Sequence, residues 1–154
     1  MSRSFITVTL NEYLFGIDVS LIREVNRSVD MTPVALAPPF IRGLMNLRGQ
    51  IITVLDPGIC LNLPACSINN LTRCVVLKSL EEESRASINE IFGILVDNVG
   101  DIISVEDKDL HHTPPNVNEL DGKFIHHVVK LEKELLLILD MAKFLESVSS
   151  HNFA

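Results

Sequence analysis

The sequence predicts a mainly β protein made of two similar small barrels. Three observations support this: short stretches alternate apolar and polar residues, β-branched residues are plentiful, and the first half of the chain recurs in the second. Alternation with a period of two is typical of half-buried strands, and β-branched side chains fit a pleated surface. A chain with many short strands and few helices hides its sheet edges by closing into barrels.

The internal repeat is the most specific of the three observations. Residues 40–56 align without a gap with residues 124–140, from an opening Phe-Ile to a closing Leu-Asp. An earlier segment, Phe15-Gly16-Ile17, recurs as Phe92-Gly93-Ile94. With the same spacing between the two copies as for Phe15 and Phe92, the residues Ile22, Glu24 and Val25 are matched by Val99, Asp101 and Ile102. Two copies are too few for a solenoid, so we expect two sub-domains in which the 40–56 and 124–140 hairpins occupy equivalent places.

The first elements follow from the alternation. Residues 5–10 and 13–17 both alternate and are separated by Asn11-Glu12, which predicts a tight hairpin. Asp18 is placed to cap a short helical turn over residues 19–24. Three prolines exclude a central strand in the next stretch; they are Pro33, Pro38 and Pro39.

A second hairpin is expected from residues 41–46 and 50–55. Its turn is predicted at Leu47-Arg48-Gly49, where Gly49 is free to adopt a positive φ. Asp56-Pro57 then has the form of a helix start, because a capping carboxylate is followed by proline at the first helical position.

The second half is expected to repeat this series. Strands are predicted over residues 73–77, 92–97, 101–105, 124–130 and 134–139, and a charged, solvated loop over residues 81–85. Leu135 to Leu139 has no polar face, so we expect it to be buried on both sides. Asp140 is placed to cap a final helix whose apolar stripe is formed by Met141, Phe144, Leu145 and Val148.

Composition limits the class of protein. A chain of 154 residues with 47% hydrophobic content is expected to form one globular unit with a sizeable core. The net charge of −7 counts against a nucleic-acid surface, which needs clustered Lys and Arg. The N-terminus has no signal-peptide core, and no apolar run approaches membrane-spanning length. These features predict a soluble cytoplasmic protein without membrane insertion.

The cysteines predict neither a metal site nor a disulfide framework. Cys60, Cys66 and Cys74 form no paired-cysteine motif, and their odd number suits a reducing compartment. We expect each of them to be a small buried apolar residue.

Several motifs together resemble the CheW family. They are Phe15-Gly16-Ile17-Asp18-Val19 leading to Ile22-Arg23-Glu24-Val25, Thr32-Pro33-Val34, residues 37–43 with Asn46-Leu47-Arg48-Gly49, residues 95–99, and residues 124–145. The match runs in order through nearly the whole chain, and its Arg-Gly-x-x-Asn-Leu-Arg-Gly core is quite specific. The resemblance implies two intertwined SH3-like five-stranded β-barrels with a short C-terminal helix, within a single CheW-like domain of residues 1–154.

The resemblance also implies a function. CheW-like proteins are non-enzymatic cytoplasmic adaptors without a cofactor, which couple chemoreceptors to a CheA-type histidine kinase in a chemosensory array. The partners implied for this chain are the regulatory domain of that kinase and the cytoplasmic tips of the receptors. Carried over by position, the partner-binding residues would be Ile22, Glu24, Val25, Gly43, Asn46, Leu47, Arg48, Gly49 and Val99.

Each of these residues also has a structural interpretation. The guanidinium of Arg48 at a hairpin tip can chelate carboxylates or carbonyls of a partner helix, or it can tie its turn to a neighbouring loop. Ile22 and Val25 either line a groove for an amphipathic receptor helix or belong to the core. Gly43 and Gly49 are expected to meet backbone requirements, and Asn46 to stabilise the turn.

Two departures from the family pattern leave alternatives open. Residues 57–63 carry no charge where the family usually has basic residues, and His127 stands where a glycine is usual. A CheW-like scaffold of a non-flagellar, pilus-type pathway with other partners is therefore an alternative. A small-barrel enzyme or nucleic-acid-binding module is an alternative from a different class.

The enzyme alternative has little support in the sequence. Asp56 and Asp140 are explained as helix caps, and neighbouring histidines such as His126 and His127 are expected to point to opposite sides of an extended chain. No nucleophile motif, phosphate loop or zinc-protease helix occurs.

Overall fold

The computed structural model describes residues 1–78, 90–112, 116–117 and 120–149, so the charged loop expected at residues 81–85 lies outside the described residues. The elements of the first half are β1 (Ser2–Leu10), β2 (Tyr13–Asp18), η1 (Val19–Leu21), β3 (Ile22–Asn26), β4 (Ile41–Leu47), β5 (Gln50–Leu55) and α1 (Pro57–Cys60). Those that follow are β6 (Arg73–Leu77), β7 (Ile91–Val96), β8 (Asn98–Glu106), η2 (Asp107–Asp109), β9 (His111–His112), β10 (Asn116–Val117), β11 (Leu120–Asp121), η3 (Gly122–Phe124), β12 (Ile125–Lys130), β13 (Leu135–Leu139) and α2 (Met141–Ser149).

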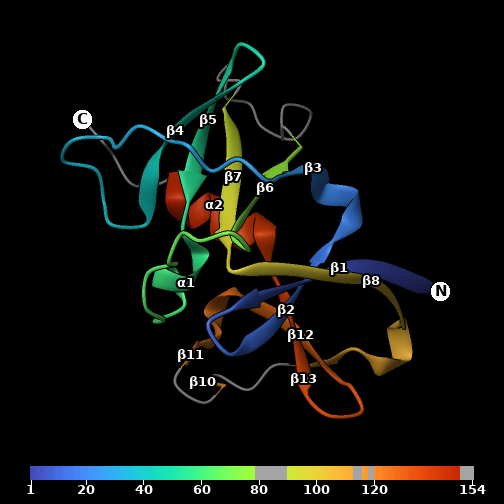
Figure 1. The fold of residues 1–154 in the computed structure, drawn as a ribbon. Coiled ribbons are helices and arrows are strands. Elements are labelled where there is room, and N and C mark those ends of the chain that lie inside the picture. The colour runs from blue at the N-terminus through green and yellow to red at the C-terminus, as the bar shows by residue number, and fades with distance from the viewer. Residues whose placement is uncertain (79–89, 113–115, 118–119, 150–154) are drawn as a thin grey trace.

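Two sheets form the molecule and lie one above the other in Figure 1. The first sheet has the strand order β3-β6-β7-β5-β4, and the second has the order β8-β1-β2-β13-β12-β9. The second sheet therefore has six strands instead of the predicted five, because the two-residue strand β9 is added to it. Apart from this addition, the predicted fold class is confirmed, including the short C-terminal helix.

The chain crosses from one sheet to the other and back. The chain leaves β2 of the second sheet and enters the first sheet as β3, which pairs with β6. It later leaves β7 of the first sheet and enters the second as β8, which pairs with β1. β1 and β2 thus share the second sheet with the last strands of the chain, whereas β3 to β7 form the first sheet, and these two crossings intertwine the two sub-domains.

The pairing register confirms the internal repeat. The parallel pair Ile52↔Ile91 between β5 and β7 corresponds to the pair Leu136↔Leu14 between β13 and β2. Both hairpins also contain a register shift at the same place, between residues 41 and 43 in one and between residues 125 and 127 in the other. The 40–56 and 124–140 hairpins therefore occupy equivalent places, as predicted.

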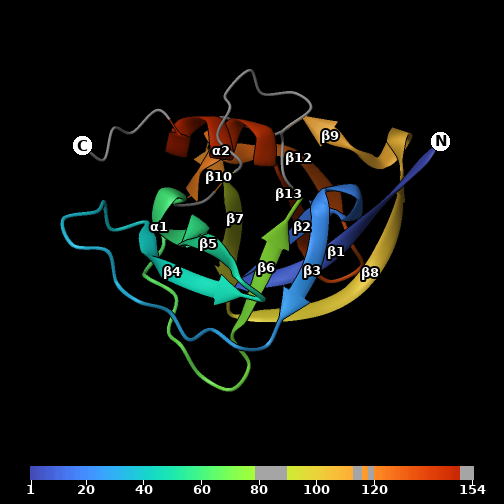
Figure 2. The same cartoon turned by 90° about the horizontal axis from the view of Figure 1, so that it is seen from above.

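One core cluster joins both sheets to α2. It contains Phe15 of β2, Ile94 of β7 and Leu137 of β13, all at most 2% exposed. The predicted apolar stripe of α2 is confirmed, and Figure 2 shows this helix lying across the upper side of the strands. Its members are Met141, Phe144, Leu145 and Val148. A core shared in this way fixes the position of each sub-domain relative to the other.

Two local expectations are wrong. The helical turn expected over residues 19–24 is limited to η1, where Asp18 accepts a hydrogen bond from the Ser20 N–H at 2.9 Å. The chain becomes extended at Ile22 because β6 offers a strand edge with which β3 pairs. Leu135 is 45% exposed because it begins β13 next to the hairpin loop, whereas the four residues that follow it are buried.

Candidate functional site

The β4–β5 hairpin ends in a two-residue turn. Leu47 pairs with Gln50, so only Arg48 and Gly49 lie between the strands, one residue fewer than predicted. Their φ angles are 51° and 85°, and positive φ at both central residues is what a type I′ turn requires. The predicted turn-stabilising role of Asn46 is confirmed, because its Oδ1 accepts a hydrogen bond from the Gly49 N–H at 3.0 Å.

Arg48 connects this turn to β3. Its Nη2 donates to Oε2 of Glu24, and Nε of Arg23 lies 3.7 Å from the same oxygen. The side chain of Arg48 is 64% exposed and that of Glu24 is 25% exposed. β3 and β4 are the two ends of the sheet order, so this ion pair bridges opposite edges of the curled sheet. The structure therefore joins two predicted site segments that are far apart in the sequence.

Among the other predicted site residues, Gly43, Ile22 and Val99 are at least partly buried, whereas Val25 is exposed. Gly43 is buried, and a Cβ at this position would lie 2.7 Å from the carbonyl oxygen of Thr32, so its role in the fold is to allow that approach. Ile22 and Val99 are partly buried against the shared core, which supports packing as their role. Val25 is 36% exposed on β3. Val99 lies on β8 in the other sheet and does not join the hairpin surface.

Asp56 forms a second polar centre that was not predicted. It is fully buried at the start of α1, yet its side chain does not cap that helix, so the expected cap is wrong. Its Oδ2 instead accepts from Nη1 of Arg42 at 2.8 Å and from the Cys66 N–H at 2.8 Å. The equivalent Asp140 does cap, accepting from the Lys143 N–H at 3.0 Å. The difference arises because Arg42 on β4 supplies a cation beside Asp56.

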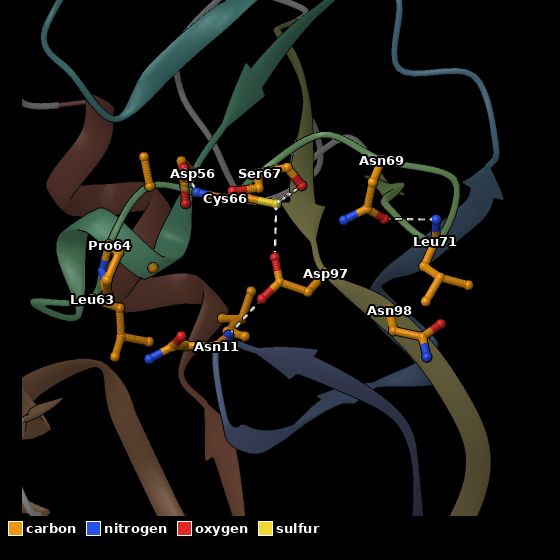
Figure 3. A pocket seen from close by; sticks show the side chains of 13 residues that line it. Asn11, Asp56, Leu63, Pro64, Cys66, Ser67, Asn69, Leu71, Asp97 and Asn98 are labelled. Carbon is orange, nitrogen blue, oxygen red and sulfur yellow. Dashed lines mark hydrogen bonds between the residues drawn. The ribbon is translucent and has the colours of Figure 1, made fainter.

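A pocket opens next to Asp56 (Figure 3). Asp97 stands at its centre, and both of its carboxylate oxygens are engaged. Oδ1 accepts from Sγ of Cys66 at 3.0 Å, and Oδ2 accepts from the Asn11 N–H at 2.6 Å. The pocket therefore joins the β1–β2 turn of one sub-domain to the loop after α1 of the other.

Sequence reasoning missed this pocket. In the sequence, Asp97 and Arg42 stand out only as members of segments that resemble the family motif. One signal was available in the internal repeat. Residues 61–72, which line much of the pocket, follow the four-residue helix α1, whereas the equivalent helix α2 continues over Met141–Ser149.

The three cysteines are free. Cys66 and Cys74 are buried, as expected, whereas Cys60 is only partly buried, so the expectation is wrong for Cys60. Burial raises the pKa of the Cys60 thiol to about 11 and that of Cys74 to about 12. Burial and the hydrogen bond to Asp97 raise the pKa of Cys66 still further. All three groups are therefore neutral thiols near neutral pH.

These raised pKa values predict slow thiol chemistry and a loss of stability at high pH. In the folded protein we expect little alkylation by iodoacetamide near neutral pH, because the thiolate is the nucleophile. Folding favours the protonated thiols, so this stabilisation is complete below the ordinary pKa of 9.0 and is lost as the pH rises through about 11 for Cys60. Mass spectrometry of alkylated protein and urea unfolding at several pH values test both expectations. If the folded protein is alkylated near neutral pH as fast as the denatured protein, the expectation of slow thiol chemistry is contradicted.

Three histidines meet at the edge of the second sheet. The ring centroids of His112 and His127 are 6.1 Å apart, and those of His126 and His127 are 4.1 Å apart. The expectation that His126 and His127 point to opposite sides is wrong, because the register shift at this point breaks the regular alternation. Burial and the neighbouring histidines lower the pKa of His127. Within the described part of the chain, no group of three or more His, Cys, Asp or Glu side chains is placed to hold a metal ion.

The structure thus consists of two small barrels with crossing strands and an ion-paired hairpin at the edge of one sheet. The profile of the CheW-like domain family matches residues 4–149, and the chain belongs to this family. It is a family of non-enzymatic adaptors and scaffolds in chemotaxis signalling, which interact with other chemotaxis proteins in an array. The assignment excludes the enzyme interpretation and gives no support to nucleic-acid binding.

Individual relatives agree with the family assignment. The chain is 29% identical over 147 residues to a chemotaxis protein CheW of Bacillus subtilis, covering 96% of this chain and 89% of the relative. It is 27% identical over 146 residues to a chemotaxis protein CheW of Treponema pallidum, covering 92% and 81%. The crystal structure of the scaffolding protein TtCheW from Thermoanaerobacter tengcongensis matches with a TM-score of 0.77 and 25% identity, over 90% of this chain and 84% of that chain. Of the helices described, none is long and apolar enough to cross a membrane.

Proposed function

We propose that this protein couples the cytoplasmic tips of chemoreceptors to the regulatory domain of a CheA-type histidine kinase in a chemosensory array. The observation that carries the proposal is the family match over residues 4–149. We also propose that it acts in the cytoplasm, where the receptor tips lie. Residues 1–154 would act as one domain, because the chain crosses between the two sheets at β3 and β8.

The proposed partner surface consists of β3 and the tip of the β4–β5 hairpin. Arg48 and Glu24 lie at its centre, and Val25 and Ile51, which is 57% exposed, offer apolar area beside them. A guanidinium carries five N–H donors, so an Arg48 held by Glu24 retains donors for a carbonyl or carboxylate of a partner. Asn46, Leu47 and Gly49 complete the surface. Ile22, Gly43 and Val99 are proposed to act through packing rather than contact.

Titration calorimetry tests the proposal with two purified partners from the same cell, a kinase regulatory domain and a receptor-tip fragment. Transient signalling interfaces are small, so we expect dissociation constants of about 1 μM. A protein that releases no heat with either partner at concentrations about a hundredfold higher does not act as this adaptor.

Replacing Arg48 separates a contact role from a structural one. Arg48→Asn is expected to keep the turn, because Asn-Gly is favoured in type I′ turns, and to change the unfolding free energy by less than about 0.5 kcal/mol. It should weaken receptor binding by about 1.5–3 kcal/mol, because a charge-assisted hydrogen bond is lost. Arg48→Lys should restore little if the contact is bidentate.

The control for this substitution is Arg27→Asn, which removes an exposed positive charge just after β3. It should change binding little. If Arg48→Asn instead lowers the melting temperature clearly and the remaining folded protein binds normally, Arg48 belongs to the fold and leaves the proposed surface.

A further inference from the structure

The histidines at the edge of the second sheet have no role in the proposed adaptor function. β9 pairs with β12 through two residue pairs, His112 with His127 and His111 with Val128. β9 is the last strand in the order of this sheet, and Figure 2 shows it beside β12. The two-residue strand therefore covers backbone N–H and C=O groups of β12 that would otherwise form an open sheet edge.

The internal repeat shows that this edge is covered differently in the two sub-domains. In the first sub-domain, Thr32 forms a bridge to Leu44 of β4, the residue that matches Val128. The residue before Leu44 is Gly43, where a Cβ would lie 2.7 Å from the carbonyl oxygen of Thr32. His127 stands at the position that matches this glycine. A pair of histidines thus replaces a close backbone contact that contains no ionisable side chain.

One ring nitrogen of His127 is buried without a partner. Its Nδ1 has no hydrogen bond to any of the residues that the structure describes. A neutral imidazole carries one N–H, whereas an imidazolium carries N–H on both nitrogens. Protonation therefore places a charged N–H donor at a buried position where no described acceptor lies, and this costs more than leaving a neutral nitrogen unpaired.

The basic side chains around His127 also oppose its protonation. The ring centroid of His112 on β9 lies 6.1 Å from that of His127, and the ring centroid of His126 on β12 lies 4.1 Å from it. Arg3 of β1 acts in the same direction, and its own partner is Asp107 of η2 at 3.6 Å. Burial is the largest cause and, together with these three side chains, lowers the pKa of His127.

We infer that the His112–His127 pair is a pH-sensitive switch, which holds β9 on β12 at neutral pH and releases it in mildly acidic solution. Docking of β9 disfavours the proton on His127. The pairing is therefore fully stable above the ordinary histidine pKa of 6.5 and weakens as the pH falls below that value. Release exposes the backbone edge of β12, whereas the Thr32–Leu44 bridge of the first sheet stays closed because neither residue titrates.

NMR of the intact protein tests the inference between about pH 7.5 and about pH 5.5, the range in which histidine titrates. Nuclear Overhauser effects between the backbones of His112 and His127 report on the pairing, and the imidazole proton signals report on the charge of each ring. We expect the cross-strand effects to lose at least about half of their intensity at the acidic end. Those between Thr32 and Leu44 are the internal reference and should not change.

His127→Gln keeps a polar side chain but removes the titrating group, so β9 should stay paired at the acidic end of the range. His112→Gln, on an exposed residue, removes the facing charge and should also reduce the loss of pairing. His111→Gln is the matched control, because successive side chains of a strand point to opposite faces, and it should release β9 as the parent does.

Two results would overturn the inference. One is pairing that persists in the parent over the whole range. The other is a loss of pairing in both His127→Gln and His112→Gln that equals the loss in the parent. If His127→Gln lacks the pairing even at neutral pH, the comparison of His112→Gln with the parent decides.

Discussion

Replacing Arg42 by alanine is expected to lower the unfolding free energy by about 3–5 kcal/mol, because it removes one partner of a buried charge pair and leaves the other uncompensated. The carboxylate of Asp56 is 0% exposed, and Nη1 of Arg42 lies 2.8 Å from its Oδ2. The same Nη1 donates to the Cys66 carbonyl oxygen at 2.8 Å. The substitution therefore also loosens the loop after α1, because this contact helps to hold it against β4.

Urea unfolding of the variant and the parent measures this loss. Arg42→Lys should recover only part of it, because a single ammonium does not reproduce the geometry of a guanidinium between two acceptors. Arg3→Ala is the matched control, since Arg3 pairs with Asp107 on the surface and both side chains are about half exposed. Such exposed pairs contribute about 0–1 kcal/mol. If the Arg42 and Arg3 variants lose the same small amount, the buried pair does not stabilise this fold.

The repeat made the architecture predictable from the sequence alone. Equivalent segments of a duplicated chain pair in equivalent ways, and the two offsets reproduce the register of β5 on β7 and of β13 on β2. Apolar periodicity predicted α2 and most of the strands, because burial of one face decides both the element and its orientation.

The parts that could not be predicted depend on contacts between distant segments. An Asp-Pro pair predicts a helix cap, but the guanidinium of Arg42 on a neighbouring strand takes the Asp56 carboxylate instead. The positive φ of Arg48 was also missed, because a non-glycine residue in that region is uncommon and local propensity disfavours it. β3 was mistaken for a helical turn because its pairing partner, β6, lies far along the chain.

The candidate surface was predictable only as a set of residues. The family motif placed Glu24 and Arg48 together by analogy, and no local pattern shows that the two side chains meet. Their ion pair depends on the curling of a sheet whose end strands are β3 and β4. No local motif predicts the pocket at Asp97, because the residues that line it come from three distant segments. These are the first turn of the chain, the loop after α1 and the end of β7.

Phe15→Ala should lower the unfolding free energy by about 3–5 kcal/mol, the usual cost of removing a fully buried phenylalanine. The side chain is 0% exposed in the core that both sheets share. It pairs across the parallel register with Leu137, which is 2% exposed. The Tyr13 ring lies 6.5 Å away between centroids at a tilt of 58°. Little of the resulting cavity can collapse, because close-packed elements surround it.

The repeat supplies the control for this substitution. Phe92 occupies the equivalent position in the other sub-domain, but it is only partly buried and its partner across the parallel pair is Thr53. Phe92→Ala should therefore cost less than Phe15→Ala, by about 1 kcal/mol or more. Because the chain crosses between the sheets at β3 and β8, each variant should still unfold in a single cooperative transition, measured by circular dichroism and by fluorescence of Tyr13. Two separate transitions, or equal losses for the two phenylalanines, would show that the sub-domains do not share the core described.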